Sequence, residues 1–250
     1  MALQKIVIKS LQSIYYRIMI PYWETQFTPY IRNVEIGEVS FQFCYGTPLS
    51  RSWYDPIKPY VLTEYLWIQR NLNLGDTHIV DAGAHHGHYS CYFASLGGKV
   101  IAVEPLLSNI DLIRINSAIN QFDIDVVQAA ISQNSGYSTF IPRSNGKLFP
   151  GIGINVPLKT LPDISPHAKV VKLDIEGAEF QILPLVIDQM PEVNAWIIEA
   201  HSTSGNVSSL AKEFTGRRFD VKYLDRNSNR IEPFNVSTSI NYTTTIFCIK

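Results

Sequence analysis

Charged side chains gather in one short segment, residues 170–179, which reads VVKLDIEGAE. Its apolar start is typical of a buried strand, and Lys172 within that strand would be costly to bury without a carboxylate partner. Because side chains alternate along a strand, Lys172 lies on the same side as Asp174. Asp174, or Glu199 near the end of a later strand, could supply the partner. A lysine and carboxylates at a strand end could orient a substrate and move its proton.

Two further residues extend this group of candidate catalytic side chains. Glu176 and Glu179 lie around the expected start of a helix, where the helix dipole favours negative charge. Glu179 is equally well explained as an ordinary acid of the first helical turn, so only Glu176 is taken as a candidate. His201 follows a strand, and an imidazole with its ordinary pKa of ~6.5 suits proton removal at neutral pH.

A metal site is the alternative use of these histidines and acids. His85, His201 and Asp174 could converge at one edge of the sheet. A metal site needs three or four converging ligands, and their spacing matches no recognised metal-binding motif. We therefore expect no metal.

A second stretch, residues 79–90, could bind a ligand and reads IVDAGAHHGHYS. A strand ending in Asp81 leads into Gly83 and Gly87 and then into a helix start. Glycine allows a tight turn and close approach of a ligand, and the helix N-terminus offers free N–H groups. A dinucleotide loop would need G-x-G-x-x-G, but His85 stands where the middle glycine should be. The spacing therefore disfavours a pyrophosphate.

The acid that ends the following strand offers a partner for a ribose. Glu104 and Pro105 close the apolar run that comes after the glycine loop. One carboxylate can accept hydrogen bonds from both hydroxyls of a ribose diol. The loop and Glu104 together indicate a cofactor that contains a nucleoside.

The elements that must position these residues alternate between strand and helix. This alternation predicts a doubly wound α/β fold, with a mostly parallel sheet and ligands at the carboxyl ends of its strands. Apolar runs predict strands at 78–82, 99–104, 124–131, 169–174, 193–200, 217–224 and 243–249, and helical spacing predicts helices at 57–72, 87–97, 107–120, 178–188 and 205–214. Residues 136–141 could add a small hairpin before the loop 142–156, which could cover a site.

The first 58 residues form an extension, packed on a domain that spans residues 59–250. Alternating residues on either side of Gly37 predict a hairpin over 34–45. Residues 3–20 have helical spacing and predict a helix packed on the domain. Aromatic residues beside that helix would also suit contact with a membrane surface or a second subunit.

Composition narrows the range of functions. The 250 residues are 46% hydrophobic and 17% charged, with a formal net charge of −1, so nucleic acid is not an expected partner. Three widely spaced cysteines form no disulfide or zinc pattern and favour a reducing compartment, the cytoplasm. No apolar run reaches the ~18 residues that a membrane-spanning helix needs.

In combination these motifs resemble the FkbM-type methyltransferases between about Tyr54 and His201. Asp81, Gly83, Ala84 and Gly87 match the family motif D-x-G-A-x-x-G, and Lys172, Asp174, Glu176, Gly177 and Glu179 match K-x-D-x-E-G-x-E. The family's E-P with spaced asparagines is matched by Glu104, Pro105, Asn109, Asn116 and Asn120. Its acid-x-His motif is matched by Glu199 and His201. The family commonly has asparagine and an apolar residue where His85 and His86 stand. The resemblance implies a Rossmann-like class I methyltransferase fold with a seven-stranded sheet. It also implies O-methylation of a hydroxyl with S-adenosylmethionine (SAM).

The resulting assignments separate a cofactor side from an acceptor side. Residues expected to contact SAM are Asp81, Gly83, Ala84, His85, Gly87, Glu104, Pro105, Asn109 and Ala129. Residues expected to orient the acceptor and remove its proton are Asp174, Glu176 and His201, with Lys172 holding the carboxylates. The expected acceptor is a small polar molecule with a hydroxyl, carbohydrate-like or a natural product. A nucleotide-dependent oxidoreductase and a non-catalytic binding protein on the same fold remain the alternatives.

Overall fold

The computed structural model describes residues 26–141, 147–148 and 153–250. The helix predicted over residues 3–20 and most of the loop predicted over 142–156 lie outside these described residues.

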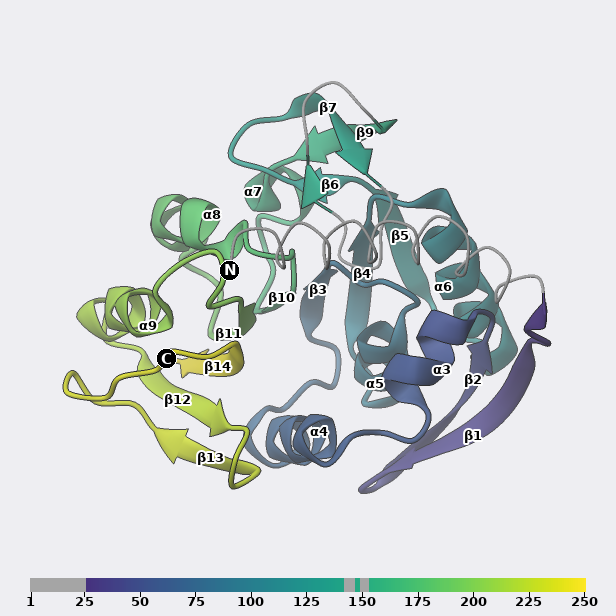
Figure 1. The fold of residues 1–250 in the computed structure, drawn as a ribbon, viewed down its shortest axis with the longest axis horizontal. Helices are drawn as coiled ribbons and strands as arrows, with labels where there is room; N and C mark the ends of the chain where they lie inside the picture. The colour runs from purple at the N-terminus through teal and green to yellow at the C-terminus, as the bar shows by residue number, and fades with distance from the viewer. Residues whose placement is uncertain (1–25, 142–146, 149–152) are drawn as a thin grey trace, which may run out of the picture.

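An eight-stranded sheet forms the centre of the described structure, with the strand order β13-β12-β14-β11-β10-β3-β4-β5 (Figure 1). Its strands are β3 (His78–Ala82), β4 (Lys99–Glu104), β5 (Ile124–Gln128), β10 (Val170–Leu173), β11 (Ala195–Ala200), β12 (Asp220–Asp225), β13 (Arg230–Pro233) and β14 (Thr244–Ile249). Strands β5, β4, β3, β10 and β11 pair in parallel, whereas β14 runs antiparallel to both β11 and β12. Every predicted strand is present, and β13 adds an eighth at the edge.

The order of the strands reverses beside β3. From β3 the chain moves outward to β4 and β5, and it then returns to place β10 on the other side of β3. In open α/β sheets the carboxyl ends of the two strands at such a switch point form the ligand site. The glycine loop follows β3 and the charged segment ends β10, so both predicted stretches lie at this point.

Helices cover both faces of the sheet (Figure 1). The helical segments are α3 (Pro48–Tyr54), α4 (Pro59–Asn71), α5 (His88–Ser95), α6 (Leu107–Asn120), α7 (Leu161–Ile164), α8 (Glu179–Val186), the short 3-10 turn η2 (Ile187–Gln189) and α9 (Val207–Gly216). Helices α8 and α9 share one apolar core with the sheet, and α4, α5 and α6 share a second core on the opposite face. Neighbouring strand residues divide between the two, as Val80 faces the first core and Ile79 the second.

Local sequence accounts for where the helices begin and which side they bury. Gly87 adopts the left-handed conformation immediately before α5, which non-glycine residues rarely enter. Asn206 caps α9 by accepting a hydrogen bond from the Ser209 backbone N–H at 2.8 Å. Helix α9 then buries Val207, Leu210 and other apolar residues at helical spacing.

The predicted hairpin is confirmed as β1 (Tyr30–Ile36) and β2 (Val39–Tyr45), joined at Gly37. It lies alongside α5 and α6 and contributes apolar residues to the second core. Buried Asn116 of α6 binds the hairpin through its side chain, which accepts a hydrogen bond from the Cys44 N–H. The same side chain donates a hydrogen bond to the His86 carbonyl. Asn116 therefore connects the hairpin to the glycine loop.

A small second sheet stands beside the carboxyl end of β5 (Figure 1). Its order is β6-β9-β7-β8, built from β6 (Ala130–Ile131), β7 (Gly136–Ile141), β8 (Lys147–Leu148) and β9 (Ile154–Lys159). The strand predicted over 124–131 is therefore two strands, with Ala129 between them. The Ala129 N–H donates a hydrogen bond to the Glu104 carbonyl at 3.3 Å, the last bond between β5 and β4.

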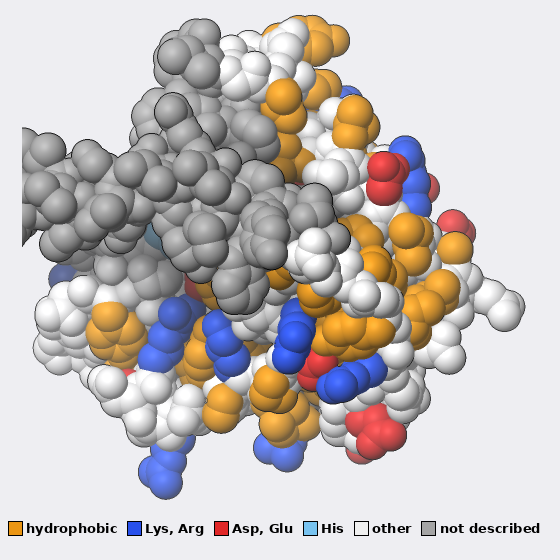
Figure 2. Space-filling model, turned by 45° about the vertical axis from the view of Figure 1, so that its right-hand side comes forward, with side chains coloured by type: hydrophobic (Ala, Val, Ile, Leu, Met, Phe, Trp, Pro, Cys, Tyr) orange, Lys and Arg blue, Asp and Glu red, His pale blue; other side chains and the backbone are white. Residues whose placement is uncertain are grey.

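The described surface carries charges of both signs. On the face in Figure 2, Lys and Arg side chains stand in separate groups with acidic and apolar side chains between them. Among the described residues, no helix has the length and apolarity required to cross a lipid bilayer. The three cysteines are buried free thiols.

Candidate active site

The glycine loop and the charged segment meet through their backbones. Gly83 follows β3 with φ +77°, and a Cβ atom there would lie 1.8 Å from the backbone oxygen of Asp174. Only glycine permits such an approach, because any side chain would collide with that oxygen. The loop after β3 is therefore in contact with the residue that follows β10.

Lys172 links the two loops electrostatically. Its Nζ lies 3.6 Å from Asp174 Oδ2 and 3.7 Å from Asp81 Oδ1, and its side chain is almost fully buried. Burial opposes the charged ammonium, but the carboxylates of Asp174 and Asp81 outweigh it and raise the pKa of Lys172. The ammonium also lies over the Tyr89 ring, 4.8 Å from its centroid. The predicted pairing with Asp174 is confirmed, and Asp81 is a second partner.

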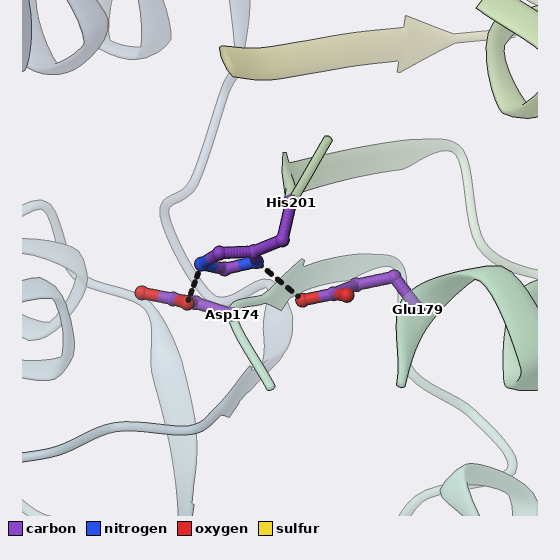
Figure 3. A group of neighbouring side chains, drawn as sticks. All are labelled: Asp174, Glu179 and His201. Carbon is purple, nitrogen blue, oxygen red and sulfur yellow. Dashed lines mark hydrogen bonds and ion pairs between the residues drawn. The ribbon is translucent and has the colours of Figure 1, made fainter. Parts of the chain in front are cut away.

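His201 stands among three carboxylates, two of which are drawn in Figure 3. Its Nδ1 lies 3.1 Å from Glu179 Oε1, and its Nε2 lies 3.8 Å from Asp174 Oδ1 and 3.6 Å from Glu176 Oε2. Glu179 is fully buried and also accepts a hydrogen bond from the Ile175 N–H at 3.0 Å. The structure thus brings together the candidate residues at the end of β10 with the histidine after β11.

This environment determines the protonation of His201. Burial opposes a charged imidazole, but the hydrogen bond and charge of Glu179 and the charge of Asp174 raise the pKa of His201 to about 9. An imidazole that already carries its proton at neutral pH cannot accept another. The role of general base expected for His201 therefore does not fit this arrangement. Burial and the Glu199 carboxylate raise the pKa of Asp174, and the charges of Lys172 and His201 oppose that shift.

Two non-glycine residues adopt left-handed backbone conformations beside this group. Glu176 has φ +56° and His85 has φ +52°. Such conformations cost free energy for residues with a Cβ and persist where the surrounding structure enforces them. They turn the loops after β10 and β3 back over the strand ends.

Asp81 lies near the end of β3 in complete burial. Its Oδ2 accepts a hydrogen bond from the Ser90 hydroxyl at 2.6 Å, and its Oδ1 faces Lys172. A buried carboxylate held in this way beside Gly83 and Gly87 can bind a cationic group of a ligand without moving. Asp81 therefore fits the position expected for a cofactor contact.

Glu104 is held at the end of β4 by three N–H donors. Its Oε2 accepts from the His85 backbone at 2.9 Å, and its Oε1 accepts from the Leu106 backbone at 3.0 Å and the Asn109 side chain at 3.1 Å. Burial raises the pKa of Glu104 to about 7, although these donors favour its ionised form. Pro105 follows directly, and Ala129 lies beside the Glu104 carbonyl. These predicted cofactor residues therefore form one group.

The remaining predicted loop residues have structural partners. The His85 ring contacts the Tyr54 hydroxyl through Nδ1 at 3.0 Å, and burial lowers the pKa of His85 to about 4. Ala84 is buried, with its N–H bonded to the Val103 carbonyl at 3.0 Å. A neutral His85 thus braces the loop against α3, while its backbone N–H orients Glu104.

Some site residues were not predicted. Glu179 was set aside as an ordinary helix acid, yet it is buried and holds His201. Glu199 pairs with Arg226 at 2.7 Å instead of with Lys172. Glu179 and His201 are far apart in the sequence, so no local pattern predicted their contact. Alternation of side chains along a strand predicted that Lys172 lies beside Asp174. Arg226 lies in a turn, where no such alternation predicts a partner.

Solved structures offer similar but distant relatives. They include a precorrin-6y C5,15-methyltransferase from Geobacter metallireducens, 13% identical over 76% of this chain and 88% of its own, with a TM-score of 0.44. Another is the magnesium protoporphyrin IX methyltransferase from Synechocystis with bound SAM, 11% identical over 75% and 76%, with a TM-score of 0.46. No curated protein sequence matches the chain.

A family comparison assigns the chain more directly. The methyltransferase FkbM domain matches residues 81–220, more than half of the chain, from the end of β3 to the start of β12. This span includes every predicted site residue, and the parallel strands with an antiparallel β14 have the Rossmann-like methyltransferase architecture expected from the sequence. The chain therefore belongs to the FkbM methyltransferase domain family.

Proposed function

We propose that the protein is a SAM-dependent O-methyltransferase that acts on a hydroxyl of a small polar acceptor, carbohydrate-like or a natural product. The observation that carries this proposal is the contact between the glycine loop and Asp174 at the switch point of the sheet. This contact supports a cofactor loop that lies directly beside a group of carboxylates. The same juxtaposition favours an enzyme over a non-catalytic binding protein.

The reaction is an in-line displacement at the methyl carbon of SAM. The acceptor oxygen forms a bond to that carbon, and the bond from carbon to sulfur breaks with its electron pair moving to sulfur, which yields S-adenosylhomocysteine. The hydroxyl proton passes to the Asp174 carboxylate. Because SAM is intrinsically reactive, holding the oxygen in line with the carbon–sulfur bond supplies much of the rate. Glu176 and His201 orient the acceptor, and Lys172 holds Asp174 in place.

Cofactor binding is assigned to the groups around β3 and β4. Glu104 accepts hydrogen bonds from the ribose hydroxyls, and Asp81 faces the methionine end of SAM. The carboxylate of Glu104 is oriented before the cofactor arrives, because three N–H groups already hold it. This preorganisation reduces the entropic cost of binding.

Glu104→Gln should weaken SAM binding by about tenfold or more, because each ribose hydroxyl loses a charged acceptor. Isothermal titration calorimetry measures this change. Affinity should also depend on pH in the wild type. Since the pKa of Glu104 is about 7, its ionised form is lost below that pH, and the affinity at pH 6 should be about tenfold lower than at pH 8.

The side-chain amide introduced by Glu104→Gln does not ionise, so the pH dependence of SAM binding should be largely absent in this variant. An affinity that is equal in the two proteins at pH 8 would remove Glu104 from the ribose site. A wild-type affinity that is constant between pH 6 and pH 8 would contradict the titration.

The polarity of the acceptor side supports a polar substrate. Asp174, Glu176 and His201 are all only partly exposed, and burying them against a flat apolar ring would cost free energy. Several hydroxyls could instead satisfy them together.

The proposal is tested by incubating the protein with SAM and a panel of glycosides, polyols and phenols, with mass detection of an added methyl group. Glu176→Gln should lower turnover about tenfold and leave SAM affinity unchanged, because its role lies on the acceptor side. Glu192→Gln replaces an exposed acid at a distant surface ion pair and should change neither quantity. Methylation of phenols in preference to every glycoside would contradict the polar acceptor.

A further inference from the structure

We propose that Asp174, Glu179 and His201 bind a divalent cation of the Mg²⁺ or Mn²⁺ type. This inference deepens the proposed function and rests on it for the role of the ion. It departs from the absence of metal expected from the sequence, where Glu179 was not a candidate and the three residues are separated along the chain.

The three side chains converge in space. Each offers one ligand atom, and these atoms all lie within 4.8 Å of one another (Figure 3). The distance from His201 Nδ1 to Glu179 Oε1 is 3.1 Å. Neighbouring ligands of an octahedral ion with bonds of about 2.1 Å lie about 3 Å apart, so this pair already has the required separation. Asp174 Oδ1 lies 3.8 Å from His201 Nε2 and is the proposed ligand atom, which leaves Asp174 Oδ2 to accept the hydroxyl proton.

Within the part of the chain that the structure describes, Glu179 also carries a buried oxygen without a hydrogen-bond partner. Glu179 is fully buried, and its Oε2 has no hydrogen-bond partner among the described residues. A buried carboxylate oxygen without a partner is costly and calls for a specific explanation. An ion bound by the Glu179 carboxylate would offset part of this cost.

The charge of the site also favours a dication. The side chains of Asp81, Asp174, Glu176 and Glu179 lie around Lys172 and His201. A SAM molecule adds one net positive charge. Acidic side chains therefore outnumber the basic ones in this group near a buried sheet edge, which suits a divalent cation.

The ligand chemistry selects the kind of ion and indicates its use. Two carboxylates suit Mg²⁺ or Mn²⁺, which keep several coordination positions for water or substrate. Glu176, whose Oε2 lies 3.6 Å from His201 Nε2, could hydrogen-bond a ligand in such a position. Two adjacent hydroxyls of the acceptor could occupy the open positions, and the ion would then hold the reacting oxygen in place.

Binding of Mn²⁺ to the full-length protein tests the site without any acceptor. Electron paramagnetic resonance should show one bound Mn²⁺ per chain, and His201→Ala and Glu179→Gln should each weaken binding at least tenfold. His167→Ala is the matched control, because exposed His167 contacts Glu192 at the same 3.1 Å as His201 contacts Glu179. This control should bind Mn²⁺ as the wild type does.

The outcomes separate this inference from the proposed function. Wild-type protein that binds no Mn²⁺ at millimolar concentration, or binds it equally in the His201→Ala variant, would overturn the metal site. So would full methylation activity after treatment with EDTA. If Mn²⁺ binds as expected but no hydroxyl of the panel is methylated, the metal site stands and the proposed O-methylation fails.

Discussion

Asp174→Asn should reduce kcat by roughly two to four orders of magnitude, the usual contribution of a positioned proton acceptor. Asparagine keeps the shape of the side chain but cannot accept the hydroxyl proton. SAM affinity should change by less than about threefold, because the cofactor contacts lie on Asp81 and Glu104. Single-turnover kinetics with saturating SAM measure the chemical step directly.

The fold should survive this substitution. Lys172 retains Asp81, 3.7 Å away, so the buried ammonium keeps a carboxylate partner. Circular dichroism and a thermal melt check this point. Glu192→Gln, at an exposed ion pair, provides a control for the loss of one negative charge and should keep wild-type kcat. A kcat for Asp174→Asn within about threefold of the wild type would refute the assignment of Asp174 as the proton acceptor.

Periodicity predicted the central sheet because its strands are buried on both faces. Apolar runs such as the one within residues 99–104 are typical of strands buried on both faces, and β4 has these bounds. The helix predicted over 107–120 also has the bounds of α6. Edge strand β13 was missed because its residues, RIEP, are half polar and resemble a loop.

The site could be predicted where its residues are close in sequence or share a strand. Alternation placed Lys172 beside Asp174, and the motif at 81–87 placed the glycine loop. Pairings that join separate elements left no such pattern. The contact of Glu179 with His201 depends on how α8 packs against β11, which only the folded structure reveals.

Contacts between separate elements also explain why His201 was expected to be a base. Its ordinary pKa is set by water, whereas its pKa in the protein is set by the surrounding carboxylates, and their number was not known from the sequence. One of these, Glu179, is buried without solvent to screen it. The role of a titratable residue is therefore less predictable than its location.

Gly83→Ala should destabilise the protein by about 2–5 kcal/mol, which combines the cost of a left-handed backbone with that of a steric clash. The added Cβ would lie 1.8 Å from the Asp174 backbone oxygen, so the loops after β3 and β10 must move apart. Urea denaturation measures the free energy of unfolding. Gly216→Ala is the control, since a Cβ there meets nothing within 4 Å and the substitution should be neutral or slightly stabilising.

A folded Gly83→Ala protein should also lose both SAM binding and turnover, because separating the two loops disturbs the cofactor side and the acceptor side together. This joint loss distinguishes Gly83 from Glu104, which acts on affinity, and from Asp174, which acts on the chemical step. If the variant were as stable as the wild type and turned over normally, the close contact between the loops would not be a requirement of the active site. If it were unstable but kept its SAM affinity and kcat when folded at low temperature, the contact would serve stability alone.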